Sequence, residues 1–178
     1  EFFKLIDGSR GSLISQKLSG TYSCVDYNIS LFDAYNYTVY VPTNASIQKL
    51  ITDGCLPTWD DYEKLTVEDF GGDRTAYNNG KKALAAIITN FLRYHIQDNS
   101  VFIGGKSVSN VKYETSKINP ANKRFFSLTV SADANSLTME DQLGNRRKVT
   151  MQSGLYNTIG REYWFQVSGS GASAVDQI

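Results

Sequence analysis

The chain has 178 residues, enough for one domain with a hydrophobic core and short for two. Its 18 basic and 18 acidic residues cancel to a formal net charge of zero, which argues against a nucleic-acid-binding protein because such proteins need a basic face. Hydrophobic residues make up 41% of the chain, a composition typical of a folded domain. No run approaches the ~18 apolar residues of a membrane helix, so we expect no transmembrane segment in this chain.

The first forty residues predict one helix followed by strands. Residues 2–8 predict a short apolar helix that ends at Gly8. Residues 11–19 fit a helical turn or a strand equally well. Residues 21–41 then hold two runs rich in β-branched and aromatic side chains, separated by residues 33–36, and each run predicts a strand.

The segment around Pro42 predicts an abrupt change from strand to helix. Tyr37–Val41 suits a pleated strand, and we expect Val41 to lie in the sheet. Pro42 ends the pairing because it has no N–H to donate. Thr43 is expected to cap a following helix with its side-chain oxygen, and Gly54 is a suitable residue to end that helix.

Two more helices are expected before residue 100. Pro57 and Thr58 mark the start of one of them. Residues 71–82 are rich in Gly and Asn and predict a loop, while residues 81–96 show the clearest helical periodicity of the chain. The apolar stripe of that helix consists of Leu84, Ile87, Ile88, Phe91, Leu92 and His95.

From about residue 101 onward the pattern becomes that of strands. Residues 124–132 alternate, and one face of that strand would carry Phe126, Leu128 and Val130. Gly144 and Asn145 predict the turn of a hairpin, residues 162–167 another strand, and residues 168–173 a Gly/Ser loop before a last strand at 174–178. Helices therefore crowd the first half and strands the second, which predicts an α+β fold.

No residue pattern points to catalysis or to a bound metal. Nucleophilic catalysis by Ser or Cys usually needs a His base, and the single histidine, His95, lies on the apolar stripe of a helix. A histidine in that position is typically a core residue with a satisfied ring nitrogen. Zinc would need three or four clustered ligands. We therefore expect no catalytic residue, no metal and no cofactor.

Two features depend on the compartment in which the protein works. Cys24 and Cys55 form one disulfide or none, because their separation in the fold is not given by the sequence. Asn28, Asn36 and Asn44 begin Asn-x-Ser/Thr triplets, which accept glycans only in a glycosylating secretory pathway and otherwise arise by coincidence.

Four segments in the right order resemble the fasciclin domain family. "YTVYVPTNASIQKL" at 37–50 resembles its first signature, in which a strand leads through Pro-Thr-Asn into a helix. "LAAIITNFLRYHI" at 84–96 resembles the central helix that ends in Tyr-His, here Tyr94 and His95. Residues 136–151 resemble the hairpin before the second signature, and residues 172–178 resemble its closing strand.

The chain departs from the family pattern in two places. Residues 174–178 lack the histidine that the family often carries in its final strand, and the chain ends there, which leaves open whether the end of the domain is cut off. Residues 54–80 are longer than in compact members and add a helical or loop insertion.

The resemblance implies a single fasciclin-like domain over 1–178, built as a β-wedge of two small sheets with a packed helical layer. It implies an adhesion or interaction module without enzymatic activity, whose partner is an extracellular, matrix or cell-surface protein. We expect a secreted or cell-surface location, in the manner of a bacterial cell-envelope lipoprotein held by an anchor outside this chain. The family further points to Tyr94 and His95 as binding residues.

Two alternatives stay open. The first is a carbohydrate-binding surface module, in which exposed aromatic rings stack on sugars. Its candidate residues are Trp59, Tyr62, Tyr77 and Trp164. The second is a hydrolase built on the same frame, which would need a cleft with two carboxylates of raised pKa.

Overall fold

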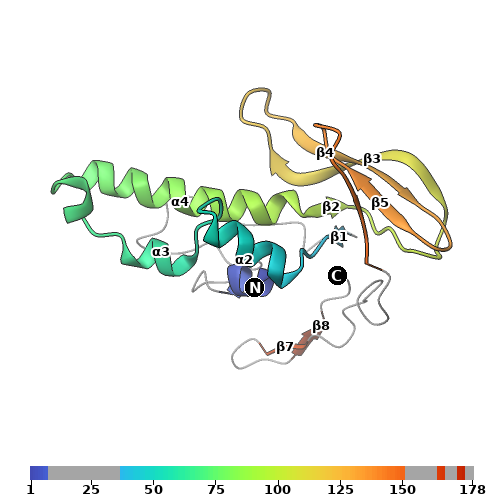
Figure 1. Cartoon of the computed structure of the whole chain (residues 1–178), viewed down its shortest axis with the longest axis horizontal. Coiled ribbons are helices and arrows are strands. Elements are labelled where there is room, and N and C mark those ends of the chain that lie inside the picture. The colour runs from blue at the N-terminus through green and yellow to red at the C-terminus, as the bar shows by residue number, and fades with distance from the viewer. Residues whose placement is uncertain (8–36, 151–163, 167–171, 175–178) are drawn as a thin grey trace. The chain divides into compact units, whose positions relative to one another are not determined.

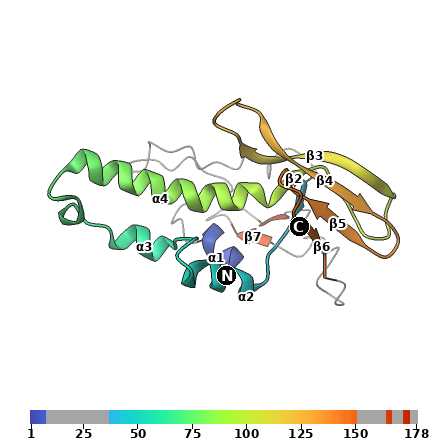
Figure 2. The same cartoon turned by 45° about the horizontal axis from the view of Figure 1, so that its top comes forward.

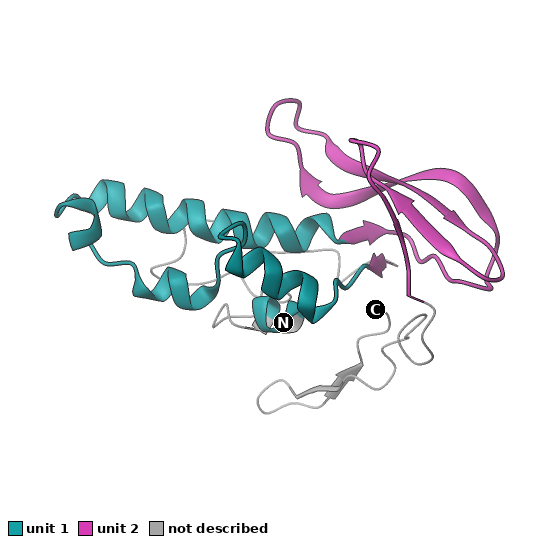
Figure 3. Cartoon of the chain, in the orientation of Figure 1, with its two compact units in different colours: residues 1–30, 40–95 teal, residues 31–39, 96–178 magenta. Residues whose placement is uncertain are grey.

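The computed structural model describes residues 1–7, 37–150, 164–166 and 172–174 (Figure 1). The chain divides into two compact units, and each unit combines two separate stretches of sequence (Figure 3). Unit 1 consists of residues 1–30 and 40–95, and unit 2 consists of residues 31–39 and 96–178. The described helices belong to unit 1 and the described strands to unit 2, which confirms the α+β class.

Unit 1 is helical in the residues that the structure describes. Its elements are the helices α1 (Phe2–Asp7), α2 (Asn44–Thr52), α3 (Trp59–Lys64) and α4 (Arg74–Tyr94), with the short 3-10 helix η2 (Glu68–Phe70). The predicted caps are confirmed. The Thr43 side chain accepts a hydrogen bond from the Ser46 N–H at 3.2 Å, and Thr58 and Asp61 form a reciprocal capping box at α3. Gly54 follows α2 with a φ of 71°, a conformation that favours glycine.

Helix α4 begins earlier than its sequence predicts. The expected loop at 71–82 is wrong from Arg74 onward, because Asp73 caps the helix by accepting hydrogen bonds from the N–H groups of Thr75 and Ala76. Gly80, which lowers helix propensity, lies against the Phe70 ring, where a Cβ would collide with the ring. The tertiary contact thus explains a glycine that locally disfavours a helix.

The buried face of α4 is rotated slightly from the predicted stripe. Ala85, Ile88 and Leu92 are completely buried. Ile87, which the stripe included, is 48% exposed, so that expectation is wrong. Thr89 takes its place on the buried face, because its hydroxyl donates a hydrogen bond to the Ala85 carbonyl at 2.9 Å and so satisfies its polar group.

Unit 2 is built around a six-stranded antiparallel sheet with the strand order β1-β2-β3-β4-β5-β6 (Figure 2). The strands are β1 (Tyr37–Val39), β2 (Ile96–Asp98), β3 (Val108–Ile118), β4 (Phe125–Ala132), β5 (Leu137–Glu140) and β6 (Arg146–Lys148). A separate two-stranded sheet pairs β7 (Trp164–Gln166) with β8 (Ala172–Ala174). The strand at 162–167 is thus confirmed in its centre, whereas β8 occupies the last positions of the predicted loop at 168–173.

Strand β2 was not expected, because the helical pattern continues to residue 96. It pairs with β1 in the register Val39↔Ile96. One further backbone bond follows, in which the Tyr40 N–H donates to the carbonyl of His95, the C-cap of α4, at 2.8 Å, and the pairing ends there. Val41 therefore lies outside the sheet and is 44% exposed, against the expectation that it would enter it.

The alternation predicted for β4 is confirmed. Leu128, Val130 and Ala132 are buried on one face, and the residues between them lie on the other face. The hairpin turn at Gly144 is also confirmed, with a φ of 82°. The Asp141 side chain organises that turn by accepting hydrogen bonds from the N–H groups of Leu143 and Asn145, each at 2.8 Å.

Several predictions lie outside the described residues. They concern the end of the first helix at Gly8, residues 11–19, the strands expected within 21–36, Cys24, Asn28, Asn36 and residues 175–178. Cys55 is described, and its thiol is exposed. No helix in the described part of the chain is long and apolar enough to cross a membrane.

Candidate functional site

The Tyr-His pair lies at the C-terminal end of α4. Tyr94 is the last helical residue, His95 is the C-cap, and their rings meet edge to face at 6.2 Å. The His95 ring Nδ1–H donates to the Phe91 carbonyl at 2.7 Å, and the ring also packs against Phe2 at a centroid distance of 5.8 Å. The expected satisfied ring nitrogen is therefore confirmed.

Burial lowers the pKa of His95 below its ordinary value of 6.5, and the hydrogen bond to the Phe91 carbonyl partly opposes that shift. The imidazole is consequently neutral at pH 7 and serves as a packing group in unit 1. Whether Tyr94 and His95 bind a partner stays a prediction. A substitution of His95 would act first on the stability of the helix end.

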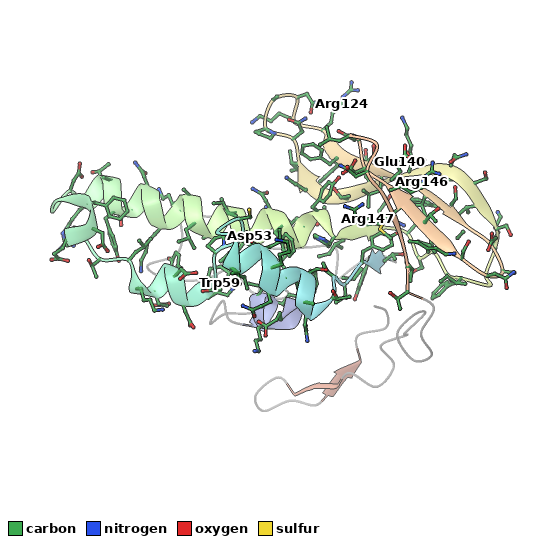
Figure 4. The ribbon with its side chains drawn as sticks, in the orientation of Figure 1. Asp53, Trp59, Arg124, Glu140, Arg146 and Arg147 are labelled. Carbon is green, nitrogen blue, oxygen red and sulfur yellow. The ribbon has the colours of Figure 1, made fainter. Side chains whose placement is uncertain are left out.

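Three of the four aromatic residues of the carbohydrate alternative lie together in unit 1. Trp59 contacts Tyr62 edge to face at 5.7 Å, and its indole N–H donates to the Leu5 carbonyl at 2.6 Å (Figure 4 labels Trp59). The Lys81 ammonium lies 4.4 Å from the Tyr62 ring centre and 5.3 Å from that of Tyr77.

In these contacts the aromatic side chains pack against other residues of unit 1 and not against a partner. Tyr62 is only 6% exposed, so the expectation that it would be an exposed stacking residue is wrong. The physical reason is that Trp59 and Lys81 pack against its ring. The side chain of the fourth residue, Trp164, lies outside the described part of the structure.

A polar depression on the outer face of the large sheet is the candidate functional site. It has a volume of about 190 Å³. Its lining residues come from four neighbouring strands and are Asn110, Thr129, Ser131, Thr138, Met139, Glu140 and Arg146. The alternation that buries Leu128 and Val130 places the residues next to them on this face.

Strand register brings the lining residues together. Thr129 pairs with Glu140, and Ser131 pairs with Thr138. A register shift between Val108 and Val111 on β3 accompanies the unusual conformation of Asn110, whose φ is 51°. Sequence analysis missed this site because its members are ordinary Ser, Thr and Asn residues that no motif connects.

Hydrogen bonds within the depression hold its side chains in place. The Asn110 N–H donates to the Ser131 hydroxyl oxygen at 2.8 Å, and that hydroxyl donates to the Asn110 amide oxygen at 3.3 Å. The Thr138 hydroxyl lies 3.5 Å from the Ser131 carbonyl, at the limit of a hydrogen bond. These side chains are therefore partly ordered before any partner arrives.

A charged pair forms the rim of the depression. The Nε–H and Nη2–H groups of Arg146 donate to one oxygen of Glu140 at 3.1 and 2.8 Å, as the neighbouring side chains in Figure 4 illustrate. The Arg146 side chain is nevertheless 69% exposed. Because a guanidinium carries five N–H donors, it can bind Glu140 and a partner's acceptor at the same time.

The depression is better suited to part of a partner than to a whole small molecule. Its volume of about 190 Å³ lies below the ~300 Å³ at which pockets for drug-sized ligands begin. Its walls offer hydroxyls, an amide, a carboxylate and a guanidinium, so both donors and acceptors are available. Among the described residues no group of three or more His, Cys, Asp or Glu could hold a metal ion.

The hydrolase alternative would need two carboxylates of raised pKa. Burial raises the pKa of Asp98 on β2 above its ordinary value of 3.8. The side-chain neighbour that bonds to its carboxylate is the amide of Asn99, at 3.1 Å. The other described carboxylates with a shifted pKa, such as Asp61 and Asp133, are shifted downward, so the described residues do not supply a second carboxylate with a raised pKa beside Asp98.

The chain matches no protein-family model, no curated protein and no solved structure.

Proposed function

We propose that the chain is a non-enzymatic, extracytoplasmic interaction module of the fasciclin type, secreted or held at a cell surface, that binds a protein or matrix partner. The resemblance at 37–50 covers β1, the Thr43 cap and α2, and the resemblance at 84–96 covers the end of α4 up to His95. In this proposal the helices and the sheet correspond to the helical layer and the β-wedge of that family.

The observation that carries the proposal is the polar depression over Asn110, Ser131, Thr138 and Glu140. It is open, it is ordered by its own hydrogen bonds, and Arg146 at its rim keeps most of its surface in water. Pre-ordered polar side chains lower the entropic cost of binding, and arginine is enriched at protein interfaces. The depression thus fits one polar side chain of a partner that lies across the sheet.

The carbohydrate alternative has less support in its original form. Stacking on a sugar needs an exposed ring face, whereas Tyr62 is buried and Trp59 is held by its bond to Leu5. A glycan would have to bind through the hydroxyls and the Glu140–Arg146 pair of the depression. The following experiment separates the two cases.

The test measures binding of the purified chain to a panel of extracellular-matrix proteins and to a glycan array at physiological salt. Thr138→Tyr fills the depression with a residue that suits a strand. Ser109→Tyr is the matched control, because Ser109 is exposed on β3 but does not line the depression. We expect saturable binding to a protein that Thr138→Tyr abolishes and Ser109→Tyr preserves.

Each other result has a definite meaning. A saturable glycan signal that only Thr138→Tyr removes would establish the carbohydrate alternative at the same site. Binding that Thr138→Tyr preserves but Tyr94→Ser abolishes would show that the partner contacts the end of α4 and not the depression. No binding to either panel would contradict the proposed function.

A further inference from the structure

Two turns of the sheet in unit 2 lie at the same end. Strand β3 runs towards the turn at 119–124, β4 returns, β5 runs back in the direction of β3, and the turn at 141–145 then leads into β6 (Figure 1). A hydrogen bond between the side chains of Gln142 and Ser127, at 3.4 Å, links the second turn to β4. We call residues 117–125 and 141–145 the cationic tip.

The cationic tip exposes large apolar side chains. Ile118 and Phe125 are 48% and 45% exposed, and Leu143 is 87% exposed. Ile118 and Phe125 are directly opposite each other in the ladder, so their side chains lie on the same face of the hairpin. Ile118 and Phe125 thus form an exposed apolar pair beside the two turns, and contiguous exposed apolar groups are a feature of interaction surfaces.

The charge of this region is positive in a chain whose formal net charge is zero. Three Lys or Arg residues stand against one carboxylate, Asp141. They are Lys117, Lys123 and Arg124. The Asp141 carboxylate stays charged, because hydrogen bonds from the Asn145 side chain and from the N–H groups of Leu143 and Asn145 lower its pKa. Between Glu114 and Asp133 the sequence contains no acidic residue.

The longer turn is internally hydrogen-bonded. The Asn119 N–H donates to the Arg124 carbonyl at 2.8 Å, and the Lys123 N–H donates to the Asn119 carbonyl at 2.9 Å. The side-chain oxygens of Asn119 and Asn122 accept from the N–H groups of Ala121 and Arg124, at 2.9 and 3.0 Å. The turn can thus enter an apolar boundary without leaving these backbone groups unpaired.

We propose that the cationic tip docks on the surface of an anionic lipid bilayer. Ile118, Phe125 and Leu143 would enter the boundary between head groups and acyl chains, while the Lys and Arg side chains remain at the anionic head groups. A soluble polyanion would use the charges but not the apolar groups. A protein would need separate pockets for side chains on two different turns, whereas a bilayer deforms around them.

The test is flotation of the purified chain with vesicles of phosphatidylcholine alone or with about 30 mol % phosphatidylglycerol, whose anionic surface attracts basic residues. We expect binding to the anionic vesicles only, weakened by added salt. Phe125→Ser and Leu143→Ser should each lower the affinity by about tenfold or more, because a fully buried side chain of this size is worth that much. Lys123→Glu together with Arg124→Glu should abolish flotation.

Matched controls lie elsewhere in the chain. Ile87→Ser replaces a side chain as exposed as Ile118, on α4 in unit 1. Lys106→Glu replaces an exposed cation just before β3, at the opposite end of the sheet. Both controls should float like the original chain, and circular dichroism should show that every variant is folded. Leu143 is 87% exposed, so we expect its substitution to leave the sheet folded.

Three results would overturn the proposal. They are no flotation with any vesicle, equal flotation with neutral and anionic vesicles, or tip variants that float as well as the controls. The proposal does not rest on the function assigned to the polar depression, and Thr138→Tyr should leave flotation unchanged. Loss of protein binding in that variant with intact flotation would show two separate surfaces.

Discussion

The helical unit and the sheet unit use their polar and aromatic groups in opposite ways. In unit 1, Trp59, Thr89 and His95 all bond to backbone carbonyls of the same unit. In unit 2, Ser131 and Glu140 lie on an exposed sheet face, where they line an open depression. These three side chains of unit 1 thus make bonds within their own unit, whereas the candidate recognition surface of unit 2 is made of ordinary polar residues.

The difference follows from the geometry of the two elements. A single amphipathic helix such as α4 must bury one broad face, so a histidine or a threonine on that face has to bond within the unit. A strand with one buried face necessarily presents every second side chain on the other. Strand β4 therefore supplies core residues and site residues from adjacent positions.

The largest effect on stability is expected from a large-to-small substitution in the core of each unit. Leu92 is completely buried in unit 1 and Leu128 is 4% exposed in unit 2. Leu92→Ala and Leu128→Ala should each cost about 2–5 kcal/mol of the free energy of unfolding, measured by urea denaturation. Leu143→Ala, an exposed control, should stay within about 0.5 kcal/mol.

The same two variants test the predicted single domain. If the chain unfolds as one domain, both shift a single transition. Two separate transitions, each sensitive to only one of the variants, would show that the two units are independent domains.

The second prediction concerns the pH dependence of unit 1. The folded-state pKa of His95 is lowered from 6.5, so between these two values the unfolded chain binds the proton and the folded chain does not. The contribution of His95 is therefore fully present above pH 6.5 and is lost as the pH falls through the lowered folded-state pKa. Thermal unfolding as a function of pH measures this loss.

His95→Gln is the control, because it removes the only histidine of the chain. The stability of this variant should vary less between pH 7 and acid pH than that of the original chain. Equal pH dependence in both proteins would mean that the imidazole is not desolvated in the folded state.

A smaller effect is expected at the strand-to-helix junction. Thr43→Ala removes the oxygen that accepts the Ser46 N–H and should cost about 1 kcal/mol. Thr43→Ser keeps the oxygen and should restore most of that stability. Partner binding should be unchanged in both variants. Loss of binding at an unaltered melting temperature would show that the junction itself contacts the partner.

The smallest effect on stability is expected from the charged pair of unit 2. The side chains of Arg146 and Glu140 are 69% and 35% exposed, so water screens their attraction. A double-mutant cycle with Arg146→Ala and Glu140→Ala should give a coupling energy below about 1 kcal/mol. A much larger coupling would mean that this pair holds the β5–β6 hairpin together rather than forming a rim for binding.

Local signals in the sequence predicted much of the secondary structure. Thr43 and Thr58 mark helix starts, because a capping hydroxyl acts on N–H groups only a few residues away. The alternation in β4 and the glycine of the turn at Gly144 act over similarly short distances. These elements are confirmed because their causes lie within the same few residues.

Features that depend on distant residues were missed or misplaced. The helical part of 71–82 includes Gly80, which packs against Phe70. Strand β2 forms by pairing with β1, which lies about sixty residues earlier in the chain. Tyr62, which the carbohydrate alternative needs on the surface, is buried, with Trp59 and Lys81 against its ring.

The sequence by itself determined the α+β class, the helix caps, the alternating strand and the internal role of His95. Only the tertiary structure decided the extent of α4, the burial of Tyr62 and the gathering of Asn110, Ser131 and Glu140 around one depression. The reason is physical. Propensity and periodicity act between neighbours in the chain, whereas register and side-chain packing join residues that are neighbours only after the chain has folded.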